Sequence, residues 1–268
     1  MDDRRFEKYF AANRELWNAY TPVNERSKVY DLAAFKRGKS SLNRIEIKEL
    51  GDVNGKTLLH LQCHFGQDTL SWARMGARVT GVDFSKKAIE LAKSLARELS
   101  IDARFIECNV YDLPGVLEEK FDVVFTSYGA LCWLPDLGQW AKVIRHFLEK
   151  TGTFYLVEFH PLLSAFDDEG VLKYPYFATA EPMRYEVKKG CYSNPDAVFS
   201  AESYEWTHSL SDTINALLQA GLKIEFVHEF PFSVYGDRPF LKQREDGFWY
   251  HQNEDINVPL MFSIKARP

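Results

Sequence analysis

Short apolar runs alternate with amphipathic segments through the middle of the chain. The run KTLLHLQ at 56–62 is too short for a buried helix, and a turn and a helical segment ending at Gly76 follow it. Residues 85–100 place apolar side chains on one face behind Ser85, a favoured helix N-cap. Further runs of strand type occupy 77–83, 103–109, 121–127 and 152–159, with a helical segment at 140–148. This alternation predicts a doubly wound α/β fold with a parallel sheet covered on both faces, whose ligands bind at the carboxyl ends of the strands.

The pattern changes after His160. Residues 161–207 hold many aromatic residues and prolines and only short alternating runs, too long for a plain connection, so we predict an inserted cap there. A helix at 209–221 then precedes two strands, at 222–230 and 259–266, with no helix between them. These two strands are predicted as an antiparallel edge pair, which makes a seven-stranded sheet of five parallel strands followed by that pair.

The ends of the chain and the composition limit the class of protein. Residues 1–50 have helical spacing and are predicted as an N-terminal helical extension. The net charge is -5, without the basic stripe that nucleic-acid binding needs, so we expect no nucleic-acid partner. No apolar run approaches the ~20 residues of a membrane span, and the start MDDRRFEKYF is not of signal-peptide type, so we expect a cytoplasmic protein without a membrane partner.

Cysteine and aromatic usage refine this picture. The four cysteines, among them Cys63 and Cys108, form no C-x-x-C pair, so we predict reduced thiols and no metal site. Aromatic residues make up 15% of the chain, but only six lie within residues 31–120. The excess lies in the loop after the run at 121–127, in the predicted cap and in the loop at 230–250, where it fits either an apolar pocket or a homodimer interface.

The loop after the first predicted strand carries a specific resemblance. The segment LLHLQCHFGQD at 58–68 resembles the first motif of class I S-adenosylmethionine-dependent methyltransferases, an acidic residue followed by glycines at alternate positions. His60 stands at the acidic position, and Gln62, His64 and Gly66 stand at the three glycine positions. The resemblance implies that these four residues line the cofactor site, although His60 fits a satisfied core histidine equally well.

Features of the next two strands strengthen the resemblance. Asp83 ends the second strand 21 positions after Gln62, close to the ~20-residue spacing at which a carboxylate accepts hydrogen bonds from ribose hydroxyls. We include the following residue, Phe84, in the predicted cofactor site. The segment CNVYDLP resembles the family's adenine-binding segment, so that Asn109 and Val110 are expected to border the adenine.

The remaining predicted site residues follow from the same resemblance. The segment at 121–136 matches the family's fourth-strand motif, which places Ser127 and Tyr128 beside the methionine moiety and the methyl group. Tyr20, in the N-terminal extension, is the expected lid contact with the cofactor. His160 and, second, Tyr128 are the candidate general bases, while a histidine that orders the Pro161 turn is an equally good interpretation of His160.

Together these features imply a Rossmann-like methyltransferase with residues 1–50 as a lid and 51–268 as the methyltransferase domain, including the cap at 161–207. The implied activity is in-line transfer of a methyl group from S-adenosyl-L-methionine to a small-molecule acceptor (EC 2.1.1.-), without a metal. A dinucleotide fingerprint in this register requires glycines at 62, 64 and 67, and none is present, which disfavours an NAD-dependent oxidoreductase. A protein that binds S-adenosylmethionine without methyl transfer is the other alternative.

Overall fold

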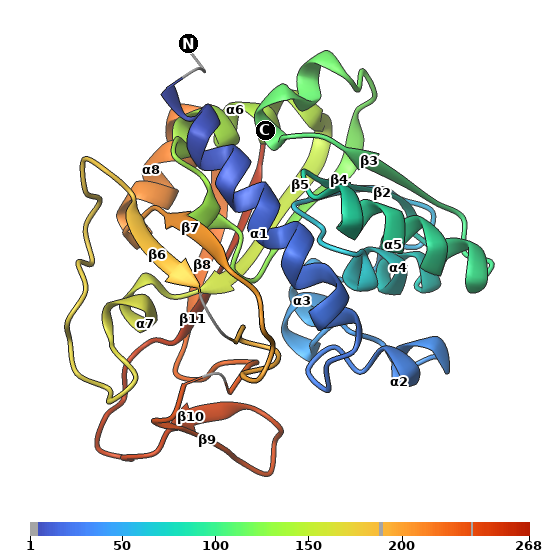
Figure 1. Ribbon diagram of the computed structural model, residues 1–268. Helices are drawn as coiled ribbons and strands as arrows, with labels where there is room; N and C mark the ends of the chain where they lie inside the picture. Colours follow the sequence, from blue (N-terminus) through green and yellow to red (C-terminus); the bar gives the residue numbers. More distant parts are fainter. Residues whose placement is uncertain (1–4, 188–189, 237) are drawn as a thin grey trace.

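A seven-stranded sheet of order β3-β2-β1-β4-β5-β11-β8 runs through the computed structural model, which describes residues 5–187, 190–236 and 238–268 (Figure 1). Its first five strands are parallel to one another: β1 Thr57–Leu61, β2 Arg78–Asp83, β3 Ala103–Glu107, β4 Phe121–Ser127 and β5 Leu148–Phe159. Strand β11 (Met261–Arg267) lies between β5 and β8 (Lys223–Phe230) and is antiparallel to both. The predicted seven-stranded fold with an antiparallel edge pair is therefore confirmed.

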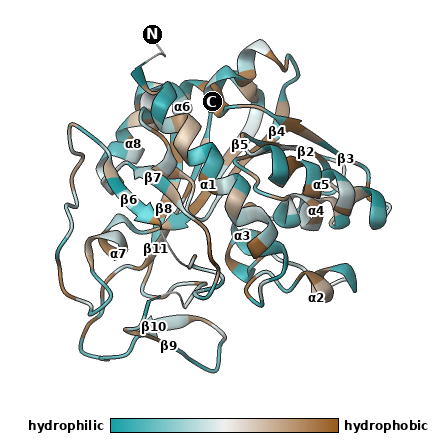
Figure 2. Cartoon of the chain, in the orientation of Figure 1, coloured by the Kyte–Doolittle hydropathy of each residue, from teal (hydrophilic) through white to brown (hydrophobic). Residues whose placement is uncertain are grey.

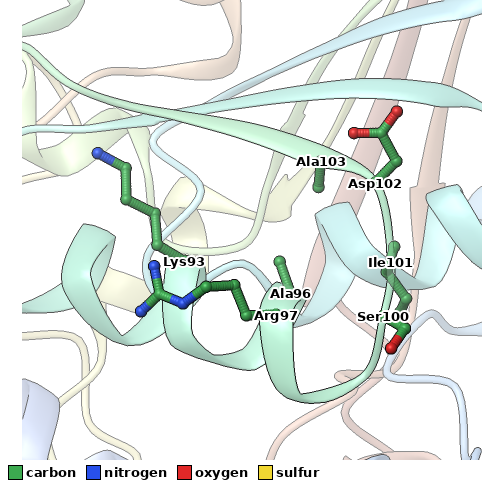
Figure 3. Close-up of a pocket in the computed structure, with 7 residues that line it drawn as sticks. All are labelled: Lys93, Ala96, Arg97, Ser100, Ile101, Asp102 and Ala103. Carbon is green, nitrogen blue, oxygen red and sulfur yellow. The ribbon is translucent and has the colours of Figure 1, made fainter.

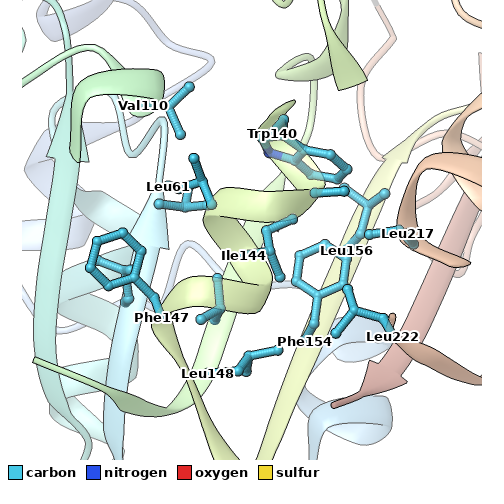
Figure 4. Close-up of a cluster of buried hydrophobic side chains, with 14 of the residues drawn as sticks. Leu61, Val110, Trp140, Ile144, Phe147, Leu148, Phe154, Leu156, Leu217 and Leu222 are labelled. Carbon is cyan, nitrogen blue, oxygen red and sulfur yellow. The ribbon is translucent and has the colours of Figure 1, made fainter. Parts of the chain in front are cut away.

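Helices cover both faces of this sheet. On one face lie α3 (Arg44–Leu50), α4 (Gln67–Arg74) and α5 (Lys86–Glu98), and on the other lie α6 (Leu137–Phe147) and α8 (Leu210–Gln219). Figure 4 shows the second layer, where Trp140 and Ile144 of α6 lie near Leu156 of β5 and Leu217 of α8. The side chain of Ser85 accepts a hydrogen bond from the backbone N–H of Ala88 at 3.2 Å. This confirms the prediction that Ser85 is the N-cap of α5.

Three helices precede the sheet. Helix α1 (Glu7–Glu25) crosses in front of it in Figure 1 and contacts both α5 and a hairpin of the cap, whereas α2 (Leu32–Lys36) and α3 follow at the side of α4. Of the described helices, none has the length and apolar character that a membrane span requires.

Two hairpins and a short helix stand outside the sheet. Helix α7 (Pro161–Ala165) is followed by the pair β6 (Met183–Val187) and β7 (Ala201–Glu205), and β9 (Leu241–Gln243) pairs with β10 (Trp249–His251). Their pattern is mixed rather than strictly apolar, and Figure 2 colours much of β6 as hydrophilic. Strands of three to five residues with this pattern give too weak a signal to predict individually.

Candidate functional site at the carboxyl edge of the sheet

The loop after β1 keeps the backbone shape of a glycine-rich loop without most of the glycines. Gln62 has φ 57°, His64 has φ 51° and Gly66 has φ 78°, so all three are left-handed. For a residue with a Cβ this conformation costs ~1–2 kcal/mol. Such strain, held by its surroundings, marks this loop as a candidate functional segment.

Gly66 is required by packing behind the loop. A Cβ added to it would lie 2.6 Å from the Phe105 ring and 3.2 Å from the Cβ of Ala92. Because Phe105 and Ala92 belong to β3 and α5, the one glycine retained from the motif lets the loop pack closely against the fold.

Asp83 ties this loop to the start of α5. Its carboxylate accepts hydrogen bonds from the backbone N–H of His64 and from that of Ser85, both at 2.8 Å. Burial raises the pKa of Asp83 to about 6, although these backbone hydrogen bonds act in the opposite direction. The residue predicted to bind ribose thus also holds the predicted cofactor loop in place.

Helix α1 covers the same region. The side-chain oxygen of Asn18 accepts hydrogen bonds from Ser85 Oγ at 2.9 Å and from the backbone N–H of Lys87 at 3.2 Å. The Trp17 ring centroid lies 5.1 Å from that of His64, and Asn24 Nδ2 lies 3.4 Å from His64 Nε2. The extension therefore contacts the loop at which the cofactor is expected.

Two aromatic residues predicted for the cofactor site, Tyr20 and Phe84, also lie at α1. Tyr20 belongs to this helix, and Phe84 lies near its residue Arg14. Tyr20 is buried, and its ring lies 5.3 Å from Phe199 and 6.0 Å from Tyr192 of the cap. The guanidinium of Arg14 lies 6.0 Å from the centre of the Phe84 ring. Both positions agree with a lid that closes over the carboxyl edge.

His60 is hydrogen-bonded inside the fold. Its Nδ1 lies 2.9 Å from Thr69 Oγ1 and its Nε2 lies 3.3 Å from Ser127 Oγ. Burial lowers the pKa of His60 to about 3, so the ring is neutral near pH 7. Ser127 in turn donates to Asp68 at 3.2 Å, and the chain of contacts joins the ends of β1 and β4.

The adenine-side residues lie at the end of β3. Asn109 is the N-cap of the 3-10 helix Val110–Gly115 and accepts a hydrogen bond from Tyr111 N–H at 3.2 Å. Its amide nitrogen and the second lone pair of its oxygen remain for a ligand. Val110 is buried in the core below it.

Tyr128 begins the loop after β4 in a strained conformation, with φ 34°. Its hydroxyl donates to Glu46 Oε2 at 2.7 Å and accepts from Asn43 Nδ2 at 3.2 Å. Burial raises the pKa of Glu46 to about 7, while the hydrogen bonds from Asn43 and Tyr128 lower it. Helix α3 thus holds the residue expected beside the methyl group.

A second buried carboxylate holds the rest of this loop. Glu158 of β5 accepts the backbone N–H of Gly129, of Ala130 at 2.7 Å, of Leu131 at 3.1 Å and of Phe159 at 2.7 Å. Burial raises the pKa of Glu158, against the effect of these hydrogen bonds. A carboxylate that accepts so many amides is a structural anchor for the loop.

Each ring nitrogen of His160 lies against a polar partner. Nδ1 accepts the backbone N–H of Leu162 at 3.1 Å as the N-cap of α7, and Nε2 lies 2.9 Å from Glu229 Oε1. With Nδ1 as acceptor, the neutral ring carries its proton on Nε2, which lies beside Glu229 without hydrogen-bond geometry. Burial lowers the pKa of His160, and Glu229 opposes this effect. In this tautomer the basic lone pair is on Nδ1, so a role as general base requires the hydrogen bond from Leu162 to open.

Sequence reasoning did not find two groups of site residues. Glu46 and Glu158 were missed, although an Asn43-x-x-Glu46 capping box and a carboxylate within the apolar run FYLVEF are visible signals. The buried Asn13, Asn24 and their neighbour Asn18 on α1 gave no such signal, because helical spacing does not say which polar side chains will be covered.

Two further observations delimit the site. No group of three or more His, Cys, Asp or Glu side chains with metal-binding geometry occurs in the described part of the chain. The shallow pocket in Figure 3 is lined by Lys93, Ala96, Arg97 and residues 100–103, where β3 begins, so it lies at the edge opposite to this site.

Comparisons with known proteins agree with this geometry. Residues 59–156, which include most of β1, all of β2 to β4, the loops described above and most of β5, match the family model described as a methyltransferase domain. This part of the chain is therefore similar to S-adenosylmethionine-dependent methyltransferases. The chain is 35% identical over 136 residues to a ubiquinone biosynthesis O-methyltransferase of Alkalilimnicola ehrlichii, so it spans about half (51%) of that relative's length.

Two other proteins match over most of their length. The uncharacterized methyltransferase YbaJ of Bacillus subtilis is 26% identical over 236 residues, which cover 82% of this chain and 89% of YbaJ. The structure of DhpI in complex with SAH has a TM-score of 0.58 at 15% identity, and the match covers 97% of each chain, which shows that the two proteins share a fold.

Proposed function

We propose that this protein is an S-adenosylmethionine-dependent methyltransferase that acts on a small-molecule acceptor. The observation that carries the proposal is the loop after β1, which adopts left-handed conformations at three alternate positions and is fastened by the carboxylate at the end of β2. In a doubly wound fold this loop and this carboxylate are the place where a nucleoside ligand binds.

The donor set at this edge fits such a ligand. Asp83 offers a carboxylate for ribose hydroxyls, Asn109 an amide for adenine, and the loop backbone an approach to the methionine moiety. Twelve residues make up the proposed site: His60, Gln62, His64, Gly66, Asp83, Phe84, Asn109, Val110 and Ser127, with Tyr20 from the lid and Tyr128 and His160 on the acceptor side.

The chain's own contribution to catalysis is positioning. When bound, S-adenosylmethionine would supply the methyl group of its sulfonium to an acceptor that attacks the methyl carbon in line, with S-adenosylhomocysteine as the leaving group. Helix α1 and the cap exclude water, while Glu46 and Glu158 hold the loop at Tyr128. Alignment of this kind can supply ~7–11 kcal/mol. His160 or Tyr128 is proposed as the base for acceptors that lose a proton.

A cofactor-binding protein without methyl transfer is the second candidate. Its support is specific, because both nitrogens of His160 are engaged by Leu162 and Glu229 and the Tyr128 hydroxyl is engaged by Glu46 and Asn43. Release of S-adenosylhomocysteine (SAH) across a broad acceptor panel separates the two candidates, since a binding protein forms none.

Thermal stabilisation tests the shared cofactor assignment. S-adenosylmethionine and SAH are expected to raise the melting temperature, because a ligand selective for the folded state stabilises it by ~2.7 kcal/mol at 100 times its Kd. NAD is expected to leave the melting temperature unchanged. Stabilisation by NAD alone would overturn the proposal in favour of an oxidoreductase.

The proposal also covers the chemical class of the acceptor, the cellular location and the oligomeric state. An aromatic or apolar acceptor is supported by the rings of Trp17, Tyr20, Trp133 and Tyr192, which contact one another above the edge. A cytoplasmic location agrees with cysteines that are all free thiols in the structure. A homodimer is supported by four exposed apolar side chains on the cap: Val171, Leu172, Phe177 and Val198. Measurement of the mass in solution tests this.

A further inference from the structure

Glu205, at the end of β7, is held between α1 and the loop after β4. The preceding residue, Tyr204, exchanges two hydrogen bonds of 2.8 Å between its backbone and the side chain of Asn13 on α1. The following residue, Trp206, donates its backbone N–H to the carbonyl of Cys132 at 2.8 Å. Cys132 follows the loop that begins at Tyr128, so Glu205 lies on the acceptor side of the proposed site.

The Glu205 side chain faces inward from the hairpin. Side chains alternate along a strand, so Glu205 shares a face with Ser203, which is 2% exposed and whose hydroxyl lies 3.4 Å from Glu205 Oε1. The residues opposite these two on β6 are Met183 and Tyr185, which point to the same face. Glu202 lies on the other face, where it pairs with Arg184.

Glu205 has fewer hydrogen-bond partners than the three carboxylates that hold the loops of the site. Asp83 accepts two backbone N–H groups, Glu158 accepts four, and Glu46 accepts a backbone N–H and a phenol. Among the described residues, the hydrogen bond found for Glu205 is the long one from Ser203. Because Glu205 is only partly exposed, its carboxylate has room for further donors, which a ligand can provide.

The surroundings of Glu205 favour a cation. Burial raises the pKa of Glu205, and the Arg238 guanidinium opposes that rise. Arg238 is itself shared with Asp168, since its Nη1 lies 3.5 Å from Asp168 Oδ1. Burial, and after it the charge of Glu205, raises the pKa of Tyr185 to about 12. Phenol rings beside a carboxylate are a favourable setting for an ammonium group, through both charge and cation–π attraction.

We propose that Glu205 binds a protonated amine carried by the methyl acceptor, so that the acceptor is an amine-bearing small molecule. This inference rests on the proposed function and concerns the anchor of the acceptor, not the atom that receives the methyl group. It predicts selectivity for amines over neutral compounds of the same shape.

Tyramine and 4-ethylphenol are suitable probes, because they share a phenol ring and an ethyl chain and differ in the amine. Their affinities are measured by NMR titration or calorimetry on the protein saturated with SAH. The wild-type protein is expected to bind tyramine about 10-fold more tightly than 4-ethylphenol. Glu205→Gln is expected to abolish this preference and to leave the affinity for 4-ethylphenol unchanged.

Two control variants separate Glu205 from its neighbours. Glu202→Gln makes the same change on the outer face of the same strand and is expected to keep the preference for tyramine. Arg238→Met removes the competing cation and is expected to keep or increase tyramine affinity. A loss of tyramine affinity in either variant contradicts the inference.

The remaining outcomes are also decisive. Equal affinity of the wild-type protein for both probes overturns the inference without any variant, and so does a preference that survives in Glu205→Gln. SAH affinity and melting temperature are measured for every variant. Normal SAH binding without amine selectivity refutes only the role of Glu205, whereas absence of SAH binding in the wild-type protein overturns the proposed function as well.

Discussion

The carboxylate of Asp83 accepts the backbone N–H of His64 at 2.8 Å, across the gap between the ends of β2 and β1. The other oxygen of the same carboxylate accepts the N–H of Ser85 at the start of α5. One side chain therefore organises both walls of the proposed nucleoside site.

Asp83→Ala is expected to weaken SAH binding by at least about 10-fold, because it removes the ribose acceptor and the anchor of the His64 loop. Asp83→Asn keeps one oxygen acceptor and is expected to lose less. Isothermal calorimetry measures both, with Asp102→Asn at the opposite edge as the matched control. Equal SAH affinity in wild type and Asp83→Ala would contradict the assignment of Asp83 to the ribose.

Gln62→Gly is expected to be more stable than Gln62→Ala by about 1 kcal/mol. Both variants lose the hydrogen bond from Gln62 Nε2 to the Ala130 carbonyl at 2.8 Å, but only glycine adopts φ 57° without strain. Urea unfolding at one pH gives the difference. If the alanine variant is as stable as the glycine variant, this loop is not strained at position 62.

Glu46 is expected to make the protein less stable as the pH rises through neutrality. Its pKa is raised from 4.5 to about 7 in the folded state, so the folded protein binds more protons than the unfolded chain in that window. The stabilising contribution is complete below pH ~4.5 and is lost as pH rises through ~7, by about 3 kcal/mol in total. Asp83, with its pKa raised to about 6, acts in the same direction.

Denaturant unfolding of wild type and Glu46→Gln between pH 5 and pH 8 tests this sign. The glutamine variant is expected to show a flatter pH dependence, because it has no proton to lose at this site. Parallel profiles for the two proteins would show that Glu46 does not titrate in the window.

His160→Ala is expected to lower kcat with little change in SAH affinity, and His160→Asn distinguishes the cause. Asparagine retains an N-cap acceptor for the Leu162 N–H but cannot act as a base near pH 7. If the histidine is the base, both variants lose kcat by ~10²–10⁴-fold. Recovery of activity in His160→Asn would assign the residue to capping α7, as would an unchanged kcat in His160→Ala.

The central sheet could be predicted because its signal is local. The conformation and the buried face of such a segment follow from its own residues, as for the apolar run at 121–127 and the capped amphipathic helix at 85–100. Asp83 was found by spacing alone, because the distance between two strand ends in a βαβ unit varies little.

The partners of the site residues could not be predicted in the same way. Glu46 meets Tyr128 across 82 positions, and Asn13 meets Tyr204 across 191. The pattern of residues also leaves open whether a histidine such as His60 or His160 faces a ligand or bonds inside the protein, since that depends on groups brought together from other elements.

The sequence by itself determined the doubly wound fold and its antiparallel edge pair, because periodicity along one chain encodes them. The loop after β1 was predicted as the cofactor loop from its resemblance to a family motif. The tertiary structure alone decided which carboxylates hold loops and which one, Glu205, is short of hydrogen-bond donors. The physical reason is that burial and hydrogen bonding depend on elements distant in sequence, and these two effects fix the charge and the availability of each polar group.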